Sequence, residues 1–222
     1  AGTHGKTTTS SMLSLVLLAA HKDPTILIGG ELSQIGGNYH IGGNEYLPFE
    51  ACEYVESFLH FKPFVSIITN IEEVHLDYFK DLNHIITSFV KFASLTSDNG
   101  CNIVCIDENT TQSIVQNVKK KAVTYALNNK NADYTAENIT LEKNGCPTFD
   151  IFNKDRKVLS VSLNVAGDHN ICNALGVTAA CEFLGIEPEY IKSGLEEFRG
   201  AKRRFDRLGK TETGVDVVDD YA

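Results

Sequence analysis

Apolar and polar positions along the 222-residue chain fall into short continuous apolar runs separated by longer stretches of helical character. Buried parallel strands are expected where these runs are rich in β-branched residues, at 64–69, 102–106 and 122–126. The stretches between and around them predict helices at 7–20, 83–97, 110–120, 170–184 and 188–198. Strands that alternate with helices indicate an α/β fold, with a mostly parallel sheet flanked by helices.

Other segments show the pattern of antiparallel hairpins. A short apolar strand at 25–28 precedes the glycine-rich turns of 36–46, and a further strand is expected at 46–51. From 133 to 165, alternating segments are joined by polar turns, and 204–218 has the pattern of a last hairpin. We therefore expect an additional small antiparallel sheet beside the parallel one.

Composition and charge narrow the possible partners. The net charge is −9, so the chain offers no general positive field for a nucleic acid or an anionic membrane, and neither is expected as a partner. No apolar run approaches the ~20 residues that span a bilayer, and no signal-peptide pattern is present. A bound phosphate would therefore have to be held by a local site.

The cysteines predict no metal or disulfide framework. None forms a CxxC pair or lies at zinc-finger spacing from a histidine, and the six are Cys52, Cys101, Cys105, Cys146, Cys172 and Cys181. We expect them to be reduced, mostly buried thiols of a cytoplasmic protein.

The most informative string opens the chain, as Gly2-Thr3-His4-Gly5-Lys6-Thr7-Thr8. Glycines let backbone N–H groups approach a phosphate, the lysine neutralises terminal phosphates, and the threonine hydroxyl is a ligand for Mg²⁺. The helix that follows adds its positive N-terminal dipole. The generic P-loop pattern has four residues between its glycines, whereas Gly2 and Gly5 have two, so the match is incomplete. An ordinary strand-to-helix turn is the structural alternative, but the string favours phosphate binding and a P-loop-type sheet.

The two ends of the sequence suggest an excerpt. The chain starts inside this loop, with no strand before it, and it stops directly after an apolar run. Its 42% hydrophobic residues are enough for one sizeable core. We expect 1–222 to be one domain of a longer enzyme, and we expect poor stability without the strand that would precede the loop.

Several strings, taken in order, resemble the signature of the Mur ligase family. They are GTHGKTTT at 2–9, EACEY at 50–54, TNIEEVHLD at 69–77, GDHNICNA at 167–174, RRF at 203–205 and DDYA at 219–222. The resemblance spans the whole chain. It implies that residues 1–222 are the central ATPase domain of a three-domain ligase, with a UDP-sugar domain before it and a Rossmann-like domain after it.

The resemblance also implies a reaction. Members of this family transfer the γ-phosphoryl of ATP to a carboxylate, and an amine attacks the resulting acyl phosphate to form an amide. The strings are most similar to those of members that join the lactyl carboxylate of UDP-N-acetylmuramate to L-alanine in peptidoglycan precursor synthesis. Two alternatives stay open: a family member that recycles murein tripeptide, and an isolated ATP-binding module without activity.

Family roles carry over to matching positions. Lys6 would contact the β- and γ-phosphates, Thr7 and Glu50 would hold one Mg²⁺, and His75 a second. Arg204 would neutralise charge on the transferred phosphoryl, so the predicted catalytic residues are Lys6, His75 and Arg204. The predicted nucleotide-binding residues are Gly2, Thr3, His4, Gly5, Lys6, Thr7, Thr8, His169, Asn170, Asn173 and Asp220.

Each of these residues also has an ordinary structural explanation. Glu50 could be a solvated carboxylate, His75 a loop histidine, Asn170 a helix N-cap and Arg204 a surface partner of nearby acids. The family usually has an acidic residue before the metal histidine, where this chain has Val74. Glu72 or Glu73 could compensate for that substitution.

Two further family comparisons concern a lysine and a different class of protein. Many members carry a carbamylated lysine downstream of the histidine, but Lys91 is expected to be an ordinary solvated helix residue. A GTPase would need an Asn-Lys-x-Asp motif to read guanine. Residues 129–132 have Ala132 in place of that aspartate, so the GTPase hypothesis fails.

Overall fold

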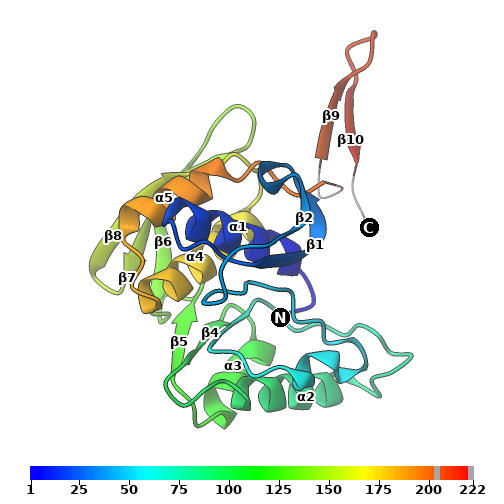
Figure 1. Cartoon of the computed structure of the whole chain (residues 1–222), viewed down its shortest axis with the longest axis vertical. Coiled ribbons are helices and arrows are strands. Elements are labelled where there is room, and N and C mark those ends of the chain that lie inside the picture. Colours follow the sequence, from blue (N-terminus) through cyan, green and yellow to red (C-terminus); the bar gives the residue numbers. More distant parts are fainter. Residues whose placement is uncertain (203–205, 220–222) are drawn as a thin grey trace.

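The computed structural model describes residues 1–202 and 206–219 (Figure 1). The α-helices are α1 (Lys6–Ala19), α2 (Leu82–Ser94), α3 (Asn109–Asn117), α4 (Asp168–Phe183) and α5 (Pro188–Glu197). Short 3-10 helices are η1 (Ser33–Ile35) and η2 (Tyr54–His60). The strands are β1 (Ile26–Leu32), β2 (Gly37–His40), β3 (Val65–Ile68), β4 (Cys101–Cys105), β5 (Ala122–Tyr125), β6 (Tyr134–Leu141), β7 (Pro147–Asn153), β8 (Arg156–Ser162), β9 (Asp206–Lys210) and β10 (Asp216–Asp219). The five predicted helices are all present, with ends shifted by a few residues.

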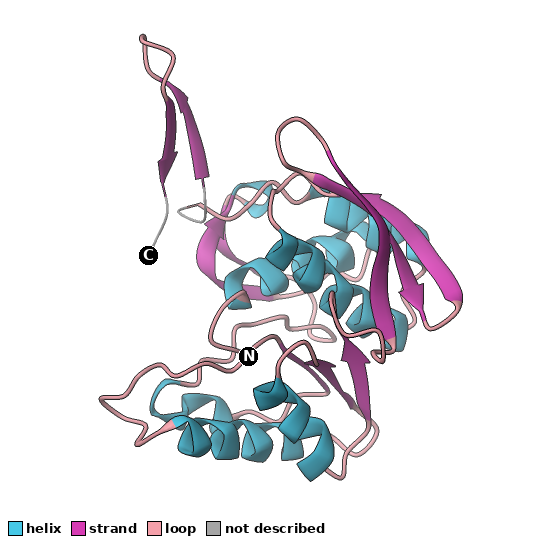
Figure 2. Cartoon of the chain, turned by 180° about the vertical axis from the view of Figure 1, so that it is seen from behind, coloured by secondary structure: helices cyan, strands magenta, loops and turns pink. Residues whose placement is uncertain are grey.

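One mixed sheet dominates the described part of the chain, with strand order β3-β4-β5-β6-β7-β8. The pairs β3–β4, β4–β5 and β5–β6 are parallel, whereas β6–β7 and β7–β8 are antiparallel. Only Tyr125 and Tyr134 pair across the β5–β6 junction. The expected antiparallel patch is therefore continuous with the parallel sheet rather than a separate layer (Figure 2). The small separate sheets are the hairpins β1–β2 and β9–β10.

Helices cover both faces of the parallel strands, because successive side chains of a buried strand point to opposite faces. Along β4, Cys101, Ile103 and Cys105 pack into the larger core with α1, α4 and α5. Val104 faces the smaller core, which is formed with α2 and α3. In Figure 1, α2 and α3 accordingly lie below β4, and α1, α4 and α5 lie above it. The continuous apolar run at 102–106 reflects burial on both sides.

Helix α1 is fixed close to α5 by a glycine. A Cβ atom added at Gly194 would lie 2.4 Å from Cα of Val16 and 2.5 Å from its N atom. The two helix backbones are thus in direct contact, which no larger residue at 194 permits. This contact holds the C-terminal half of α1 against α5.

The prediction of a strand at 46–51 is wrong. The segment is extended: Tyr46 O accepts from Thr25 N, and Pro48 O accepts from Leu27 N. It forms only an isolated bridge, between Phe49 and Leu27. Its other edge borders an apolar groove of about 570 Å³. With a partner on one side only, and with no N–H on Pro48, the segment cannot form a regular strand within the described part of the chain.

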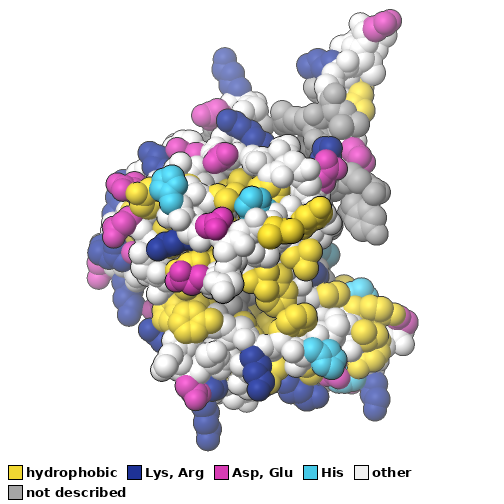
Figure 3. Space-filling model, in the orientation of Figure 1, with side chains coloured by type: hydrophobic (Ala, Val, Ile, Leu, Met, Phe, Trp, Pro, Cys, Tyr) yellow, Lys and Arg dark blue, Asp and Glu magenta, His cyan; other side chains and the backbone are white. Residues whose placement is uncertain are grey.

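The groove lies beside the free edge of β3. Its lining includes Leu13, Leu47, Phe49, Phe61, Phe64 and Ile67. Figure 3 shows hydrophobic side chains gathered between the upper and lower parts of the molecule. The amino group of Ala1 donates to Ile67 O at 2.7 Å, and Thr69 N donates to Ala1 O at 3.1 Å, the pattern of a parallel ladder.

The last described segment projects from the body as the hairpin β9–β10 (Figure 1). Just before it, Lys202 N donates to Glu31 O at 2.9 Å, which ties the chain to β1. Among the described residues, no helix is both long and apolar enough to cross a membrane.

Candidate nucleotide site

A cavity of about 940 Å³ lies where the first turn of α1, the end of β4 and the first turns of α4 meet. Most of the predicted binding residues line it. They are Thr3, His4, Gly5, Lys6, Thr7, Thr8, Glu50, His169, Asn170 and Asn173. Gly2 is buried behind the loop and His75 lies outside the cavity lining. The tertiary fold thus brings residues from positions 3 to 173 to one cavity.

The N-terminus of α1 opens into this cavity. Gly5 is the N-cap in a left-handed conformation, with φ of 80°, and no described side chain caps the helix. The first turn, Lys6–Thr9, contains no acidic residue. The backbone N–H groups before Thr9, whose own N–H donates to Gly5 O, and the helix dipole can therefore attract an anion. The positive φ favours glycine at this position, and a Cβ atom there would also lie 2.8 Å from Oδ1 of Asn173.

The loop before α1 is held against the end of β3. Thr3 N donates to Asn70 O at 3.0 Å, and His4 N donates to Asn70 Oδ1 at 2.7 Å. The Thr69 hydroxyl donates to His4 O at 2.7 Å. These bonds fix the loop against residues that line the same cavity, since Thr69 and Asn70 both contribute to its wall.

Lys6 reaches back over the loop. Its Nζ donates to Gly2 O at 2.6 Å and to Thr3 O at 3.2 Å. It also lies 3.2 Å from Oε1 and 3.1 Å from Oε2 of Glu53. The ammonium group is therefore positioned by two carbonyls and one carboxylate, at the base of the loop that would surround a phosphate.

Thr7 and Glu50 form a pair of hard oxygen ligands at the cavity wall. The Thr7 hydroxyl donates to Glu50 Oε2 at 3.1 Å, and Gly29 N donates to Glu50 Oε1. Hydroxyl and carboxylate oxygens suit Mg²⁺, which usually takes one or two protein ligands together with phosphate oxygens and water. The donor set therefore fits the predicted metal. Glu50 is not merely a solvated carboxylate, since it accepts from the Thr7 hydroxyl and from the Gly29 backbone, both distant in sequence.

Glu53 is a site residue that the sequence reasoning missed. Its side chain is 1% exposed, and its Oε1 lies 3.6 Å from Nε2 of His75. It thus joins His75 to Lys6, two residues 69 positions apart. Oε2 has no aligned hydrogen-bond donor among the described residues. A glutamate three positions after Glu50 in the string EACEY was visible, but nothing in the sequence showed that it alone would be buried.

The acidic partner of His75 is Glu53, not Glu72 or Glu73 as the sequence suggested for the Val74 substitution. Glu72 instead lies 3.6 Å from Nε2 of His4. His75 itself has a φ of 55°, a left-handed conformation that non-glycine residues seldom adopt. Strain of this kind persists where surrounding contacts over-determine the backbone, and it is often found at functional sites.

Helix α4 contributes two buried asparagines. The Asn170 side chain donates to Ala166 O at 2.8 Å, Asn173 donates to Asn170 Oδ1 at 3.4 Å, and the Thr9 hydroxyl donates to Asn173 Oδ1 at 3.2 Å. This chain of hydrogen bonds connects α4 to α1. The N-cap alternative for Asn170 is wrong, because α4 begins at Asp168 and its N-cap is Gly167. His169 is exposed at the cavity rim.

Two predicted site residues, Arg204 and Asp220, lie outside the described residues. Lys91 is exposed on α2 and lies 3.4 Å from Oε1 of Glu56. This is the ordinary surface role expected for it.

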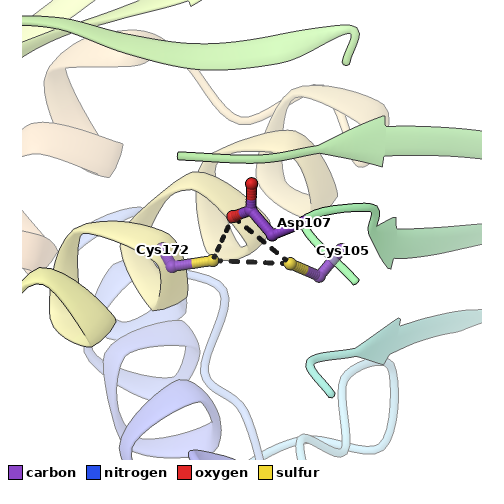
Figure 4. Close-up of side chains that lie close together, drawn as sticks. All are labelled: Cys105, Asp107 and Cys172. Atoms are coloured by element: carbon purple, nitrogen blue, oxygen red, sulfur yellow. Dashed lines mark hydrogen bonds between the residues drawn. The ribbon is translucent and has the colours of Figure 1, made fainter. Parts of the chain in front are cut away.

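Two thiols also meet in the cavity wall. Cys105 Sγ and Cys172 Sγ are 3.6 Å apart, and both face Oδ2 of Asp107 (Figure 4). The hydrogen bond to Cys172 lowers the pKa of Cys105 despite its burial, while that bond and burial raise the pKa of Cys172. The six cysteines, all within the described part of the chain, have free thiols, and only Cys52 is exposed. The expectation of mostly buried cysteines is confirmed, but their spacing gave no sign of the Cys105–Cys172 contact.

Uncapped helix amides, a lysine and a Thr–Glu oxygen pair together have the features of a phosphate-binding loop. The chain belongs to the Mur ligase family, since residues 1–181 match the model of the Mur ligase middle domain. It is similar to proteins named UDP-N-acetylmuramate–L-alanine ligase. The identity is 50% over 221 residues with that of Acetivibrio thermocellus and 46% over 222 residues with that of Clostridium perfringens.

These alignments cover 100% of the chain but 47% and 48% of the two relatives, so the chain spans about half the length of the curated relatives it matches. Among solved structures, it is similar to the UDP-N-acetylmuramate–alanine ligase of Thermotoga maritima, with a TM-score of 0.85 and 32% identity over 100% of the chain and 49% of that structure. A murein peptide ligase of Psychrobacter arcticus gives a TM-score of 0.80 and 26% identity, over 100% and 50%.

Proposed function

We propose that the chain is the central ATP-binding domain of a three-domain ligase that joins the lactyl carboxylate of UDP-N-acetylmuramate to L-alanine. The relatives named for this reaction support the proposal, as does the share of their length that the chain spans. The product would be an amide used in peptidoglycan precursor synthesis. The six free cysteines favour a reducing compartment, so we expect the reaction to occur in the cytoplasm.

The observation that carries the proposal is the convergence of Lys6, Thr7 and Glu50 on one cavity with α4. Transfer of a phosphoryl group to a carboxylate brings two anions together, so it needs positioning and charge neutralisation. The first-turn amides of α1 and the Lys6 ammonium supply both. The carboxylate would be activated as an acyl phosphate with release of ADP, and attack by the amine of L-alanine would release phosphate.

Thr7 and Glu50 would hold one Mg²⁺, which when bound neutralises phosphate charge. The 3.1 Å contact between these side chains already places two oxygen ligands side by side. His75 would serve a second Mg²⁺, with Glu53 orienting its ring, since a ligating histidine commonly has a carboxylate partner on its other side. Arg204 and Asp220 would complete the site from the segments at the C-terminal end.

Asn170, Asn173 and His169 would receive the base and ribose. The two asparagines lie on one face of α4, and their mutual hydrogen bond fixes the amide orientation before a nucleotide arrives. His4, Thr3 and Thr8, also in the cavity lining, would contact the phosphates from the loop and the first turn.

The test is phosphate release by the full-length protein that contains this chain. We expect release only when ATP, UDP-N-acetylmuramate and L-alanine are all present. Lys6→Ala should lower kcat by about 10²–10³-fold, the typical loss when one preorganised electrostatic group is removed from a transition state. The matched control is Lys192→Ala, because Lys192 is an exposed lysine on α5, outside the cavity. An unchanged rate in Lys6→Ala would refute the assignment of the phosphate loop.

Substrate choice is tested separately. If a preformed murein tripeptide replaced L-alanine as the better amine, the proposed substrate would be wrong and the recycling reaction would take its place. If the full-length protein bound ATP but released no phosphate with either amine, the ligase proposal would fail.

A further inference from the structure

The two thiols and one carboxylate in the cavity wall form a cluster that the proposed ligase reaction does not use. Cys105 ends β4, Asp107 follows two residues later, and Cys172 lies in the second turn of α4. Cys105 Sγ is 3.6 Å from Cys172 Sγ, and the Asp107 Oδ2 atom lies 3.9 Å from the first sulfur and 4.0 Å from the second. Figure 4 shows the three side chains pointing toward a common centre.

The carboxylate of Asp107 is held rigidly. Its Oδ1 accepts from Asn128 N at 2.8 Å and Asn129 N at 3.0 Å, and its Oδ2 accepts from Leu127 N at 2.8 Å. A carboxylate oxygen has two lone pairs, so Oδ2 keeps one for the side on which the sulfurs lie. Backbone donors of this kind fix a ligand in place before a metal arrives, as outer-shell partners do in metal sites.

The distances match those of a tetrahedral site. With Zn–S bonds of about 2.3 Å and Zn–O bonds of about 2.0 Å, neighbouring ligands stand about 3.8 Å apart for two sulfurs and about 3.5 Å apart for sulfur and oxygen. The observed 3.6, 3.9 and 4.0 Å differ from these edges by a few tenths of an ångström. Shifts of that size are within reach of side-chain rotation alone.

We propose that Cys105, Cys172 and Asp107 form a binding site for a thiophilic divalent cation of the Zn²⁺ type. Three protein ligands leave the fourth position to water or another molecule in the cavity, which all three residues line. Each thiol gives up its proton on binding, so two protons leave for each cation bound and no electron is transferred. Thiolate ligands select this site against Mg²⁺, which prefers the oxygen pair at Thr7 and Glu50.

The site has a functional consequence that rests on the proposed nucleotide function. Because the cluster and the candidate phosphate loop line one cavity, binding of a thiophilic cation would be coupled to binding of a nucleotide. By linkage, each would change the affinity of the other by the same factor.

The test uses the full-length protein, reduced and free of nucleotide, titrated with Co²⁺ as a spectroscopic substitute for Zn²⁺. We expect a thiolate-to-cobalt charge-transfer band that saturates at one ion, is bleached by Zn²⁺ and depends on both Cys105 and Cys172. Loss of even an outer-shell partner weakens metal sites about 10–100-fold, so Cys172→Ser should lower the affinity by at least about 100-fold. Cys52→Ser is the matched control, because this thiol is exposed and outside the cavity.

A second measurement needs no substitution. In the unaltered protein, Zn²⁺ should protect Cys105 and Cys172 from alkylation, as mapped by mass spectrometry, and leave Cys52 reactive. Absence of the band, or a band equally strong in Cys172→Ser, would overturn the metal site. So would conversion of the two thiols to a disulfide by a mild disulfide reagent without any cation-dependent protection.

Coupling to the nucleotide is then measured on its own. ATP is added as its Mg²⁺ complex, with excess Mg²⁺, so that free ATP does not remove Co²⁺ by chelation. We expect the bound nucleotide to change the Co²⁺ affinity. A Co²⁺ affinity that the nucleotide leaves unchanged would contradict the coupling while the metal site stood. Failure of ATP to bind at all would count against the proposed function and not against the cluster.

Discussion

Removing the charge of Glu53 tests the least expected part of the site. Glu53→Gln keeps the shape of the side chain and removes its negative charge, next to Lys6 at 3.1 Å and His75 at 3.6 Å. Exposed ion pairs contribute about 0–1 kcal/mol, whereas loss of one partner of a buried pair costs about 3–5 kcal/mol. Glu53 is 1% exposed and Lys6 20% exposed, so the pair falls between these cases.

The carbonyls of Gly2 and Thr3 still accept from Lys6 after the substitution, which reduces the loss. We therefore expect Glu53→Gln to lower the free energy of unfolding by about 2–3 kcal/mol, between the limits for exposed and buried pairs. The assay is urea unfolding of the unaltered protein, Glu53→Gln, Lys6→Met and the double variant. The coupling energy between the two substitutions should be about 1–2 kcal/mol, because the side chains are in contact.

The matched control is Glu31→Gln, which breaks the ion pair with Lys202. There the two side chains are 49% and 55% exposed, although Nζ and Oε1 are only 2.6 Å apart. This substitution should change stability by less than about 1 kcal/mol. If Glu53→Gln cost no more than Glu31→Gln and were additive with Lys6→Met, Glu53 would not be the buried anchor of the loop.

Three further predictions concern stability. Gly194→Ala should lower the free energy of unfolding by about 1–3 kcal/mol, because the added Cβ atom overlaps the Val16 backbone. This cost outweighs the gain of about 1 kcal/mol in helix propensity. A variant that is more stable in urea unfolding would refute this reasoning. Asn102→Ala should cost about 1–3 kcal/mol, since it leaves buried hydroxyls without their acceptor; a loss below 0.5 kcal/mol would be contrary evidence. The hydrogen bond from Lys157 is the main cause that lowers the pKa of Asp150 to about 2. The ionised Asp150 carboxylate should therefore stabilise the fold above about pH 4, and this stabilisation should be lost as the pH falls from about 4 to about 2. In Asp150→Asn, the free energy of unfolding should change less with pH over this interval.

Much of the fold was predictable because it depends on local patterns. Helical spacing showed all five α-helices, and continuous β-branched runs showed β3, β4 and β5, since strands buried on both faces contain few polar positions. The strand predicted at 46–51 does not form, because its pairing depends on what lies on the other side of the segment, where the groove is. The antiparallel strands β6, β7 and β8 are joined to the parallel strands through one paired position, between Tyr125 and Tyr134. Nothing in the sequence indicated this long-range pairing.

The sequence by itself indicated the candidate phosphate loop, its helix and the candidate residues Lys6 and Thr7, because glycine conformation, lysine charge and a hydroxyl ligand act over a few neighbouring positions. Glu50 became a candidate only through the family resemblance, since it lies far from this loop in the sequence. Only the tertiary structure decided that Glu53 would be buried between Lys6 and His75. The same holds for Cys105 and Cys172, which are 67 residues apart and meet because β4 and α4 pack in one core. Burial and long-range contact are properties of packing, and a single sequence contains no local signal for them.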